Sequence, residues 1–262
     1  MYDIKLLRSR LKGGYIPKML SFKAWICIEI GEEGLYVWSV QRNGNLAEIL
    51  QSPLSTQTLW DAQALANMIH KPISSGRVLI LLNSAQTVLR LTDYDDIHYA
   101  FPIGEGFYEK DYDFSHSLIG DIYFMAAIPN SISKCLVEFC RIINLRNIHI
   151  LDTVEYRMAY YFGKIQKEPT WLFINQGAGV RLIALNNGIP HAIYFLSKDP
   201  EFRILELERI WACQLSENIP QHAVIFPNNL DWLCNFITQK AVSQIEFPDF
   251  RKTLLQNWVK QL

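Results

Sequence analysis

The sequence has little net charge and no long apolar segment. Its 25 lysine and arginine residues nearly balance 26 aspartate and glutamate residues, which leaves a formal net charge of -1 over 262 residues. A protein without an overall positive field has no general attraction to nucleic acid. No run approaches the roughly 18 consecutive apolar residues that predict a membrane span, and no signal-peptide pattern precedes the first predicted strand. We therefore expect a chain that is soluble by itself.

Sites for metal ions and for common hydrolytic chemistry are also lacking. The six histidines have no spacing that would place two or three ligands on one element. The Gly-x-Ser-x-Gly motif that presents a nucleophilic serine is absent. The five cysteines are scattered through apolar runs, which is typical of buried reduced thiols: Cys27, Cys135, Cys140, Cys213 and Cys234. We expect no metal site, no serine hydrolase and a reducing compartment.

Hydrophobic residues are abundant, at 50% of the chain, and 13% of the residues are aromatic. A chain of this length can bury a large core as one bilobal domain or as two small ones. The stretch from Ala24 to Val40 is an apolar strand, an Ile-Gly-Glu-Glu-Gly turn and a second strand. An Arg-Asn-Gly-Asn turn, which is a strong hairpin signal, leads to a third strand from Leu46 to Gln51. These runs predict an antiparallel meander.

The rest of the chain alternates helices and strands. The pattern predicts a helix at 55–71, strands at 78–83, 87–92 and 121–128, a helix at 130–144, a strand at 147–151 and a helix at 155–163. A second meander follows at 171–174, 180–185 and 191–195, with a helix at 201–215, a strand at 223–226, a helix at 229–238 and a last helix ending at 262. The second meander starts about 145 residues after the first. The pattern therefore indicates a duplication.

One segment, from Asp93 to His116, interrupts this alternation. It mixes seven acidic residues with seven aromatic residues and has no clear period. Two interpretations stay open. The segment could be a solvated insertion that packs its aromatic side chains on the main body, or an acidic aromatic surface for a basic peptide.

The N-terminal residues 1–20 form a predicted basic amphipathic arm. Basic residues stand beside leucines and isoleucine there: Lys5, Arg8, Arg10, Lys12 and Lys18. The arm is either a simple terminal extension or a contact for a membrane surface or a partner, because lysine and arginine beside leucine suit an anionic lipid interface.

The duplicated order of strand, glycine turn, strand, hairpin and strand, followed by helix and strand, resembles the actin-like superfamily, whose fold is ribonuclease H-like. Within it, the chain resembles PilM of type IV pilus assembly, the related MshI, and the cytoplasmic domain of the type II secretion protein GspL. The resemblance covers residues 24–230 and rests on six short blocks: Ile28-Glu29-Ile30-Gly31, residues 78–92, residues 123–128, residues 149–159, Asn175-Gln176-Gly177-Ala178 and residues 205–210. It implies an α/β fold of two lobes, each a mixed sheet with flanking helices. The first lobe would span 21–165, with an insertion near 93–116, and a second, truncated lobe would span 166–262.

The two glycine turns match the phosphate-binding turns of active relatives in position but not in chemistry. The resemblance implies as nucleotide-binding candidates Gly31, Glu32, Glu33, Asn175, Gly177 and Gly179. Active relatives follow Asp-Ile-Gly with small hydroxyl residues, where this chain has two glutamates. Two like charges within about 4 Å cost on the order of 1 to 4 kcal/mol, and an amide replaces the second aspartate, which would hold magnesium or orient water. We expect weak ATP binding or none, no catalytic residue and no turnover.

Two further acidic residues follow the strand predicted at 147–151. Asp152 and Glu155 stand where active relatives place a residue toward the nucleotide cleft. Without a metal partner, the simpler interpretation is that Asp152 or Thr153 caps the next helix.

The resemblance implies a non-catalytic cytoplasmic scaffold subunit of a type IV pilus or type II secretion inner-membrane platform. Such a subunit would lie at the inner face of the cytoplasmic membrane and bind the short cytoplasmic tail of a single-span membrane protein beside the first meander. Contact with the secretion motor ATPase and a homodimer are further options, and no nucleic-acid partner is expected. The alternative is an ATP-binding protein with Gly31, Asn175, Gly177 and Gly179 around the phosphates. A domain of a sugar-kinase-like regulator is a third hypothesis.

Overall fold

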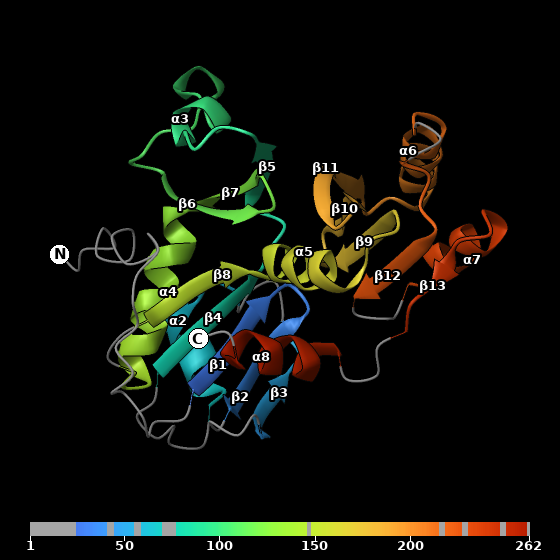
Figure 1. The fold of residues 1–262 in the computed structure, drawn as a ribbon. Helices are drawn as coiled ribbons and strands as arrows, with labels where there is room; N and C mark the ends of the chain where they lie inside the picture. Colours follow the sequence, from blue (N-terminus) through green and yellow to red (C-terminus); the bar gives the residue numbers. More distant parts are fainter. Residues whose placement is uncertain are drawn as a thin grey trace. The chain divides into compact units, whose positions relative to one another are not determined.

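The computed structural model (Figure 1) describes residues 25–40, 45–54, 59–69, 77–145, 148–214, 218–226, 230–246 and 250–260. The predicted basic arm, residues 1–20, lies outside these residues. The chain forms two compact units. Unit 1 consists of Met1–Leu82, Asn130–Thr153 and Leu255–Leu262, and unit 2 consists of Asn83–Pro129 and Val154–Leu254. Among the helices that the structure describes, none has the length and apolar character needed to cross a bilayer.

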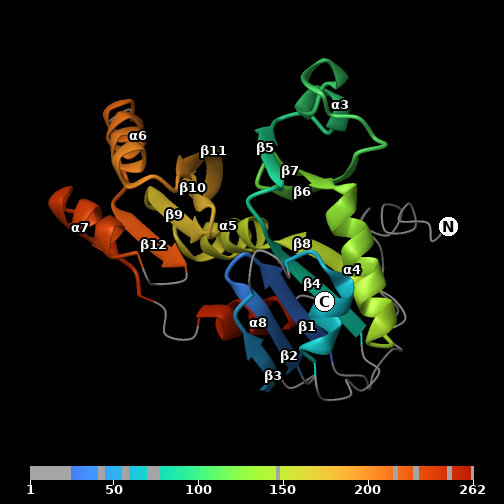
Figure 2. The same cartoon turned by 180° about the vertical axis from the view of Figure 1, so that it is seen from behind.

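Unit 1 is built on a five-stranded mixed sheet (Figure 2). Its strands are β1 (Trp25–Gly31), β2 (Gly34–Val40), β3 (Leu46–Ser52), β4 (Arg77–Asn83) and β8 (Ile148–Thr153), in the order β3-β2-β1-β4-β8. The first three strands are antiparallel neighbours, and β4 pairs with β8 in parallel. The predicted meander is confirmed. Nearly every residue of β1 and β4 is buried, which explains why their sequences are continuous apolar runs.

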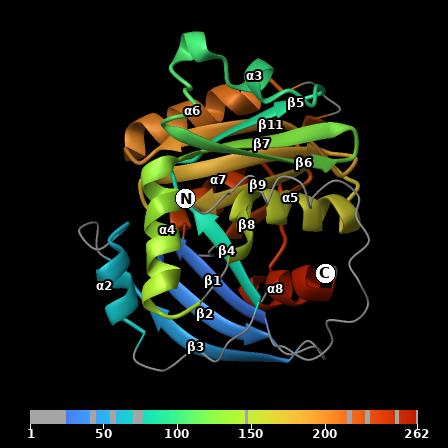
Figure 3. The same ribbon diagram turned by 90° about the vertical axis from the view of Figure 1, so that its left-hand side faces the viewer.

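Two helices of unit 1, α2 (Ala62–Asn67) and α4 (Asn130–Ile142), contact each other beside this sheet (Figure 3). α4 buries the apolar face that its spacing predicts. α2 begins later than the predicted helix at 55–71, because Trp60 has a φ of 66°, far from helical values. Asp61 caps α2 instead, and its side chain accepts two backbone N–H groups of the first turn.

Unit 2 contains a second five-stranded sheet with the same topology. Its strands are β9 (Thr170–Asn175), β10 (Gly179–Asn186), β11 (Ile189–Ser197), β12 (His222–Phe226) and β13 (Ser243–Gln244), in the order β11-β10-β9-β12-β13. Again three successive antiparallel strands are followed by two parallel ones. The two sheets therefore confirm the predicted duplication. β13 was not predicted, because two residues carry no periodicity.

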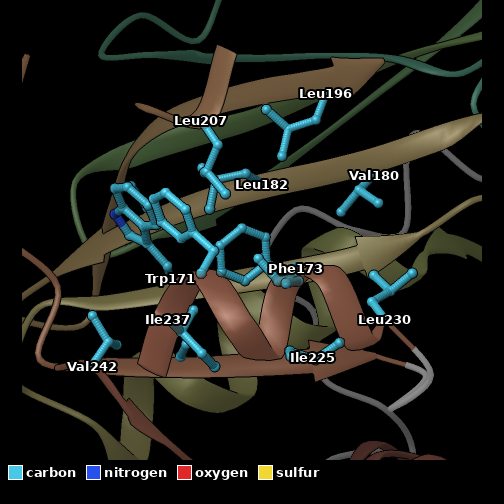
Figure 4. Close-up of a cluster of buried hydrophobic side chains, with 14 residues drawn as sticks. Trp171, Phe173, Val180, Leu182, Leu196, Leu207, Ile225, Leu230, Ile237 and Val242 are labelled. Atoms are coloured by element: carbon cyan, nitrogen blue, oxygen red, sulfur yellow. The ribbon is translucent and has the colours of Figure 1, made fainter. Parts of the chain in front are cut away.

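Helices cover both faces of the sheet of unit 2. α6 (Pro200–Ala212) and α7 (Asp231–Gln239) supply side chains to a core cluster that includes Trp171, Phe173, Leu182, Leu207 and Ile237 (Figure 4). α5 (Val154–Ile165) contacts β9, β10 and β11 and contributes no residue to that cluster. Because successive side chains of a strand point to opposite faces, α5 covers the other face of the sheet.

A smaller antiparallel sheet completes unit 2. It contains β5 (Val88–Thr92), β6 (Tyr112–Ile119) and β7 (Ile122–Pro129) in the order β5-β7-β6, with α3 (Ile97–Ala100) and a 3-10 turn, η1 (Ile103–Glu105), between β5 and β6. The strand β6 occupies the end of the acidic aromatic segment and is missing from the prediction. Its side chains alternate poorly, and its pairing with β7 is what fixes it as a strand. The last predicted helix is present as α8 (Phe250–Lys260).

Candidate functional site

The first glycine turn is a tight β-hairpin in unit 1. Gly31, at the end of β1, pairs with Gly34, at the start of β2, so Glu32 and Glu33 are the two turn residues. Both glutamates are half-buried. Gly34 has a φ of +151°, and a Cβ atom there would lie 2.7 Å from the carbonyl oxygen of Ser52 on β3. Close packing of three strands therefore accounts for one glycine of this turn, and the structure brings Gly31, Glu32 and Glu33 together as predicted.

The second glycine turn, between β9 and β10 in unit 2, bonds its own N–H groups. The N–H of Gln176 donates to the carbonyl of Gly179 at 2.9 Å, and the N–H of Ala178 donates to the carbonyl of Gln176 at 2.6 Å. The N–H of Gly177 donates to the side-chain oxygen Oδ1 of Asn175 at 3.1 Å. Gly177 has a φ of 66°, in the left-handed region that glycine adopts without strain. The predicted residues Asn175, Gly177 and Gly179 thus belong to one closed turn.

This closure decides how well the second turn fits a phosphate chain. Phosphate-binding turns work because successive backbone N–H groups point at the anion. Here the three N–H groups between Asn175 and Gly179 already have acceptors inside the turn. A nucleotide would have to displace these bonds before it could use the same donors. The residues present therefore fit a phosphate poorly.

Gly179 is required by packing rather than by a ligand. A Cβ atom at this position would lie 2.5 Å from the carbonyl oxygen of Leu196 and 2.6 Å from the ring of Phe195, both on β11. Backbone atoms cannot yield to such a contact without moving the strand. The glycine pattern that resembles a nucleotide site is therefore needed by the sheet itself.

A buried polar network lies directly behind the second turn, entirely within unit 2. The side chain of Gln176 donates to Glu155 Oε1 at 2.6 Å and to Asn83 Oδ1 at 3.4 Å. Its Oε1 accepts from Arg181 Nε at 3.2 Å and Nη2 at 3.1 Å. Arg181 Nε also lies 3.3 Å from Glu155 Oε1, and Arg181 Nη2 donates to the carbonyl of Thr87 at 3.0 Å. The network joins the loop after β4, the first turn of α5 and the β9–β10 turn.

Every side chain of this network is withdrawn from water. Glu155 and Gln176 are 0% exposed and Arg181 is 5% exposed. A buried charge is tolerated only when it is paired and hydrogen-bonded, because its desolvation penalty is several kcal/mol, on the order of the pairing energy itself. Glu155 also lies in the first turn of α5, where the helix dipole favours a negative charge. The network therefore anchors the second turn through the side chain of Gln176.

Sequence reasoning missed this network. It considered Glu155 only as a residue that faces the nucleotide cleft in active relatives. It did not single out Arg181, although an arginine inside the apolar run of β10 signals a buried partner. Asp152, the other acidic residue considered, accepts the N–H of Thr153 through Oδ1 at 2.9 Å. The described residues contain no group of three histidine, cysteine or acidic side chains placed to hold a metal ion.

The cysteine prediction is correct for three residues. Cys27, Cys135 and Cys140 are buried, Cys234 is half-buried, and all five cysteines are free thiols. Cys213 is exposed, and the expectation of burial is wrong there because α6 ends at Ala212 and Cys213 forms its C-cap.

Comparison with known proteins gives no match by sequence, since no family model and no curated protein matches the chain. Solved structures do match. A Bacteroides thetaiotaomicron protein with an actin-like ATPase fold and unknown function superposes with a TM-score of 0.68 at 13% identity, over 92% of this chain and 99% of its own. The chain has an actin-like fold. The fold class that the family resemblance implied is thereby confirmed.

Two other solved structures are similar over most of their length. The PilM–PilN type IV pilus biogenesis complex matches with a TM-score of 0.54 at 13% identity, over 87% of this chain and 93% of the matched chain. The cytoplasmic domain of EpsL, an inner-membrane component of the type II secretion system of Vibrio cholerae, matches with a TM-score of 0.53 at 10% identity, over 91% and 94%. The predicted resemblance to PilM and to the cytoplasmic domain of a type II secretion protein is therefore confirmed at the level of the fold.

Proposed function

We propose that this actin-like chain is a non-catalytic subunit of a type IV pilus or type II secretion platform at the inner face of the cytoplasmic membrane. Its role there is to bind the short cytoplasmic tail of a membrane partner. The likeness in fold to PilM in its complex with PilN and to EpsL supports this assignment. The observation that carries the non-catalytic part is the closed second turn, whose three N–H groups are bonded internally.

The edge of the unit 1 sheet offers a place for an extended tail. β3 (Leu46–Ser52) is the last strand of the described sheet order on its side and pairs with β2 alone. Its residues are exposed or half-buried, in contrast to the buried strands β1 and β4. An edge strand can add a peptide as a further strand, with backbone hydrogen bonds for affinity and side-chain pockets for specificity. We place the tail along β3.

Nuclear magnetic resonance tests this assignment. The probe is a synthetic peptide with the sequence of the N-terminal cytoplasmic tail of a candidate single-span membrane partner, titrated into isotopically labelled protein. The expected result is a set of amide shifts centred on residues 45–54, and a peptide of the same composition in scrambled order serves as the control. Unchanged amide signals across residues 25–54 and 77–100 at millimolar peptide would reject the proposal.

A further inference from the structure

The aromatic residues of the acidic segment divide into a buried set and an exposed set. The buried set fills a small core between α3 and the β5-β7-β6 sheet: Phe101 and Phe114 are buried there, and the half-buried Phe107 and Tyr112 pack against them. The exposed set comprises Tyr94 at 55%, Tyr99 at 64% and Tyr108 at 45%, and the aliphatic Ile103, at 57%, is exposed in the same segment. Packing on the main body therefore explains the first set and leaves the second without a structural role. We call the exposed set, with its neighbouring carboxylates, the tyrosine surface.

The segment that carries the tyrosine surface includes α3 and extends from the small sheet (Figure 1). The rings of Tyr94 and Tyr99 are in contact, with centroids 4.9 Å apart. His98 Nε2 lies 4.0 Å from Glu109 Oε1, which brings the loop that carries Tyr108 next to α3. Tyr94 and Tyr99 thus share one patch, and the loop with Tyr108 lies beside it; exposed apolar side chains gathered in this way mark an interaction site.

Charge is concentrated at the same place. Between Asp93 and Asp113 the chain has seven acidic residues and one lysine, a net charge of -6, whereas the whole chain has a net charge of -1. Six of the seven acidic residues are exposed. Acidic charge of this density attracts a positively charged partner and repels a negatively charged one.

The segment already holds one cation of the chain, Arg90, by a carboxylate and aromatic rings together, and a second, Lys110, lies over a ring. The Arg90 guanidinium bonds Glu105 Oε2 at 2.6 Å and lies 5.6 Å and 5.4 Å from the rings of Phe101 and Phe107. Lys110 Nζ lies 5.3 Å from the ring of Tyr108. The segment thus binds an arginine by cation–π contact combined with a carboxylate, and it contacts a lysine through the ring of Tyr108.

We propose that the tyrosine surface is a docking site for a basic segment of a partner protein, one in which lysines or arginines alternate with apolar residues. The exposed rings take the apolar side chains and the stems of the basic residues, and the carboxylates take the charged ends. The tyrosine surface belongs to unit 2 and β3 belongs to unit 1, so the proposed contact is a second one besides the tail.

Fluorescence anisotropy with a labelled peptide of repeated lysine, serine and leucine tests this docking site on the full chain. Binding is expected to weaken as salt is raised, and a peptide with glutamate in place of lysine is expected not to bind. The double variant Tyr99→Ala/Glu109→Gln removes one ring and one carboxylate and should weaken binding about threefold to tenfold, as exposed cation–π and ion-pair contacts do.

The matched control is Phe202→Ala/Glu201→Gln on α6, which removes one exposed ring and one exposed carboxylate elsewhere in unit 2. It should leave the affinity unchanged. Equal loss in both double variants, or equal binding of the lysine and glutamate peptides, overturns the proposal. Tighter peptide binding by Arg8→Gln/Arg10→Gln would overturn it as well, because the basic arm of the chain would then be the occupant.

Discussion

The buried ion pair between Glu155 and Arg181 leads to a stability prediction. Arg181→Met removes the guanidinium and leaves the carboxylate of Glu155 in a place where it is 0% exposed. Gln176 would still donate to that carboxylate, but the carbonyl of Thr87 and Oε1 of Gln176 would lose the donors that Arg181 provides. The variant therefore leaves a buried charge and two buried acceptors short of partners.

The expected loss follows from these groups. Breaking one side of a buried pair lowers the free energy of unfolding by about 3 to 5 kcal/mol. The double variant Glu155→Leu/Arg181→Met removes both charges and should be less destabilised than the sum of the single variants, with a coupling of about 1 to 3 kcal/mol. The double variant should still have a lower free energy of unfolding than the unmodified protein. The side-chain amide of Gln176 is buried, and in the double variant it loses its hydrogen bonds with Glu155 and Arg181.

Urea unfolding followed by circular dichroism measures these free energies. Because two units can unfold separately, hydrogen exchange of peptides from β9, β10 and α5 shows whether the loss occurs in unit 2. Arg141→Met on α4 is the control, since its pair with Glu138 is exposed and its loss should leave stability unchanged. An Arg181→Met loss below about 1 kcal/mol, or fully additive single variants, would refute the role assigned to the pair.

Three further predictions concern thiols and glycines. A thiol reagent should modify exposed Cys213 first in the native protein and should reach buried Cys140 only on unfolding; comparable rates would contradict the packing of α4. Burial raises the pKa of the Cys140 thiol to about 12. The buried thiol therefore contributes fully to stability below the ordinary thiol pKa, and this contribution is lost as pH rises above that value, because the thiol of the unfolded chain then ionises while the buried thiol does not. Cys140→Ala should therefore reduce the fall in melting temperature above about pH 8.5, and an unchanged pH profile would count against this. Gly179→Ala should lower the free energy of unfolding by about 1 to 3 kcal/mol, because the added Cβ would clash with the carbonyl oxygen of Leu196. The control is Gly104→Ala, whose Cβ would meet no atom within 4 Å and which should leave that free energy almost unchanged. Urea unfolding compares the two variants, and equal losses would contradict the packing of Gly179.

Periodicity and turn chemistry were sufficient to predict the duplicated fold. The continuous apolar runs of β1 and β4 and the glycine turns of both meanders have local causes that a sequence displays. The helix α2 was predicted too long because its start depends on the backbone of Trp60 and on the cap formed by Asp61, which propensity does not reveal. The strand β6 was missed because its pairing with β7, and not its own pattern, determines it.

The candidate site was predicted in position but not in detail. The order of Asn175, Gly177 and Gly179 was enough to place a glycine turn between two strands. That the turn closes on itself, and that Glu155 and Arg181 meet behind it, depends on contacts between residues far apart in the chain. Local sequence patterns do not predict which of these distant residues come into contact.

Calorimetric titration of the protein with magnesium ATP tests most directly whether the second turn is closed to nucleotide. The three internal N–H bonds of that turn predict no heat of binding up to millimolar ATP. Submillimolar binding that is lost in Gly177→Arg would contradict the account and would favour an ATP-binding protein with this fold.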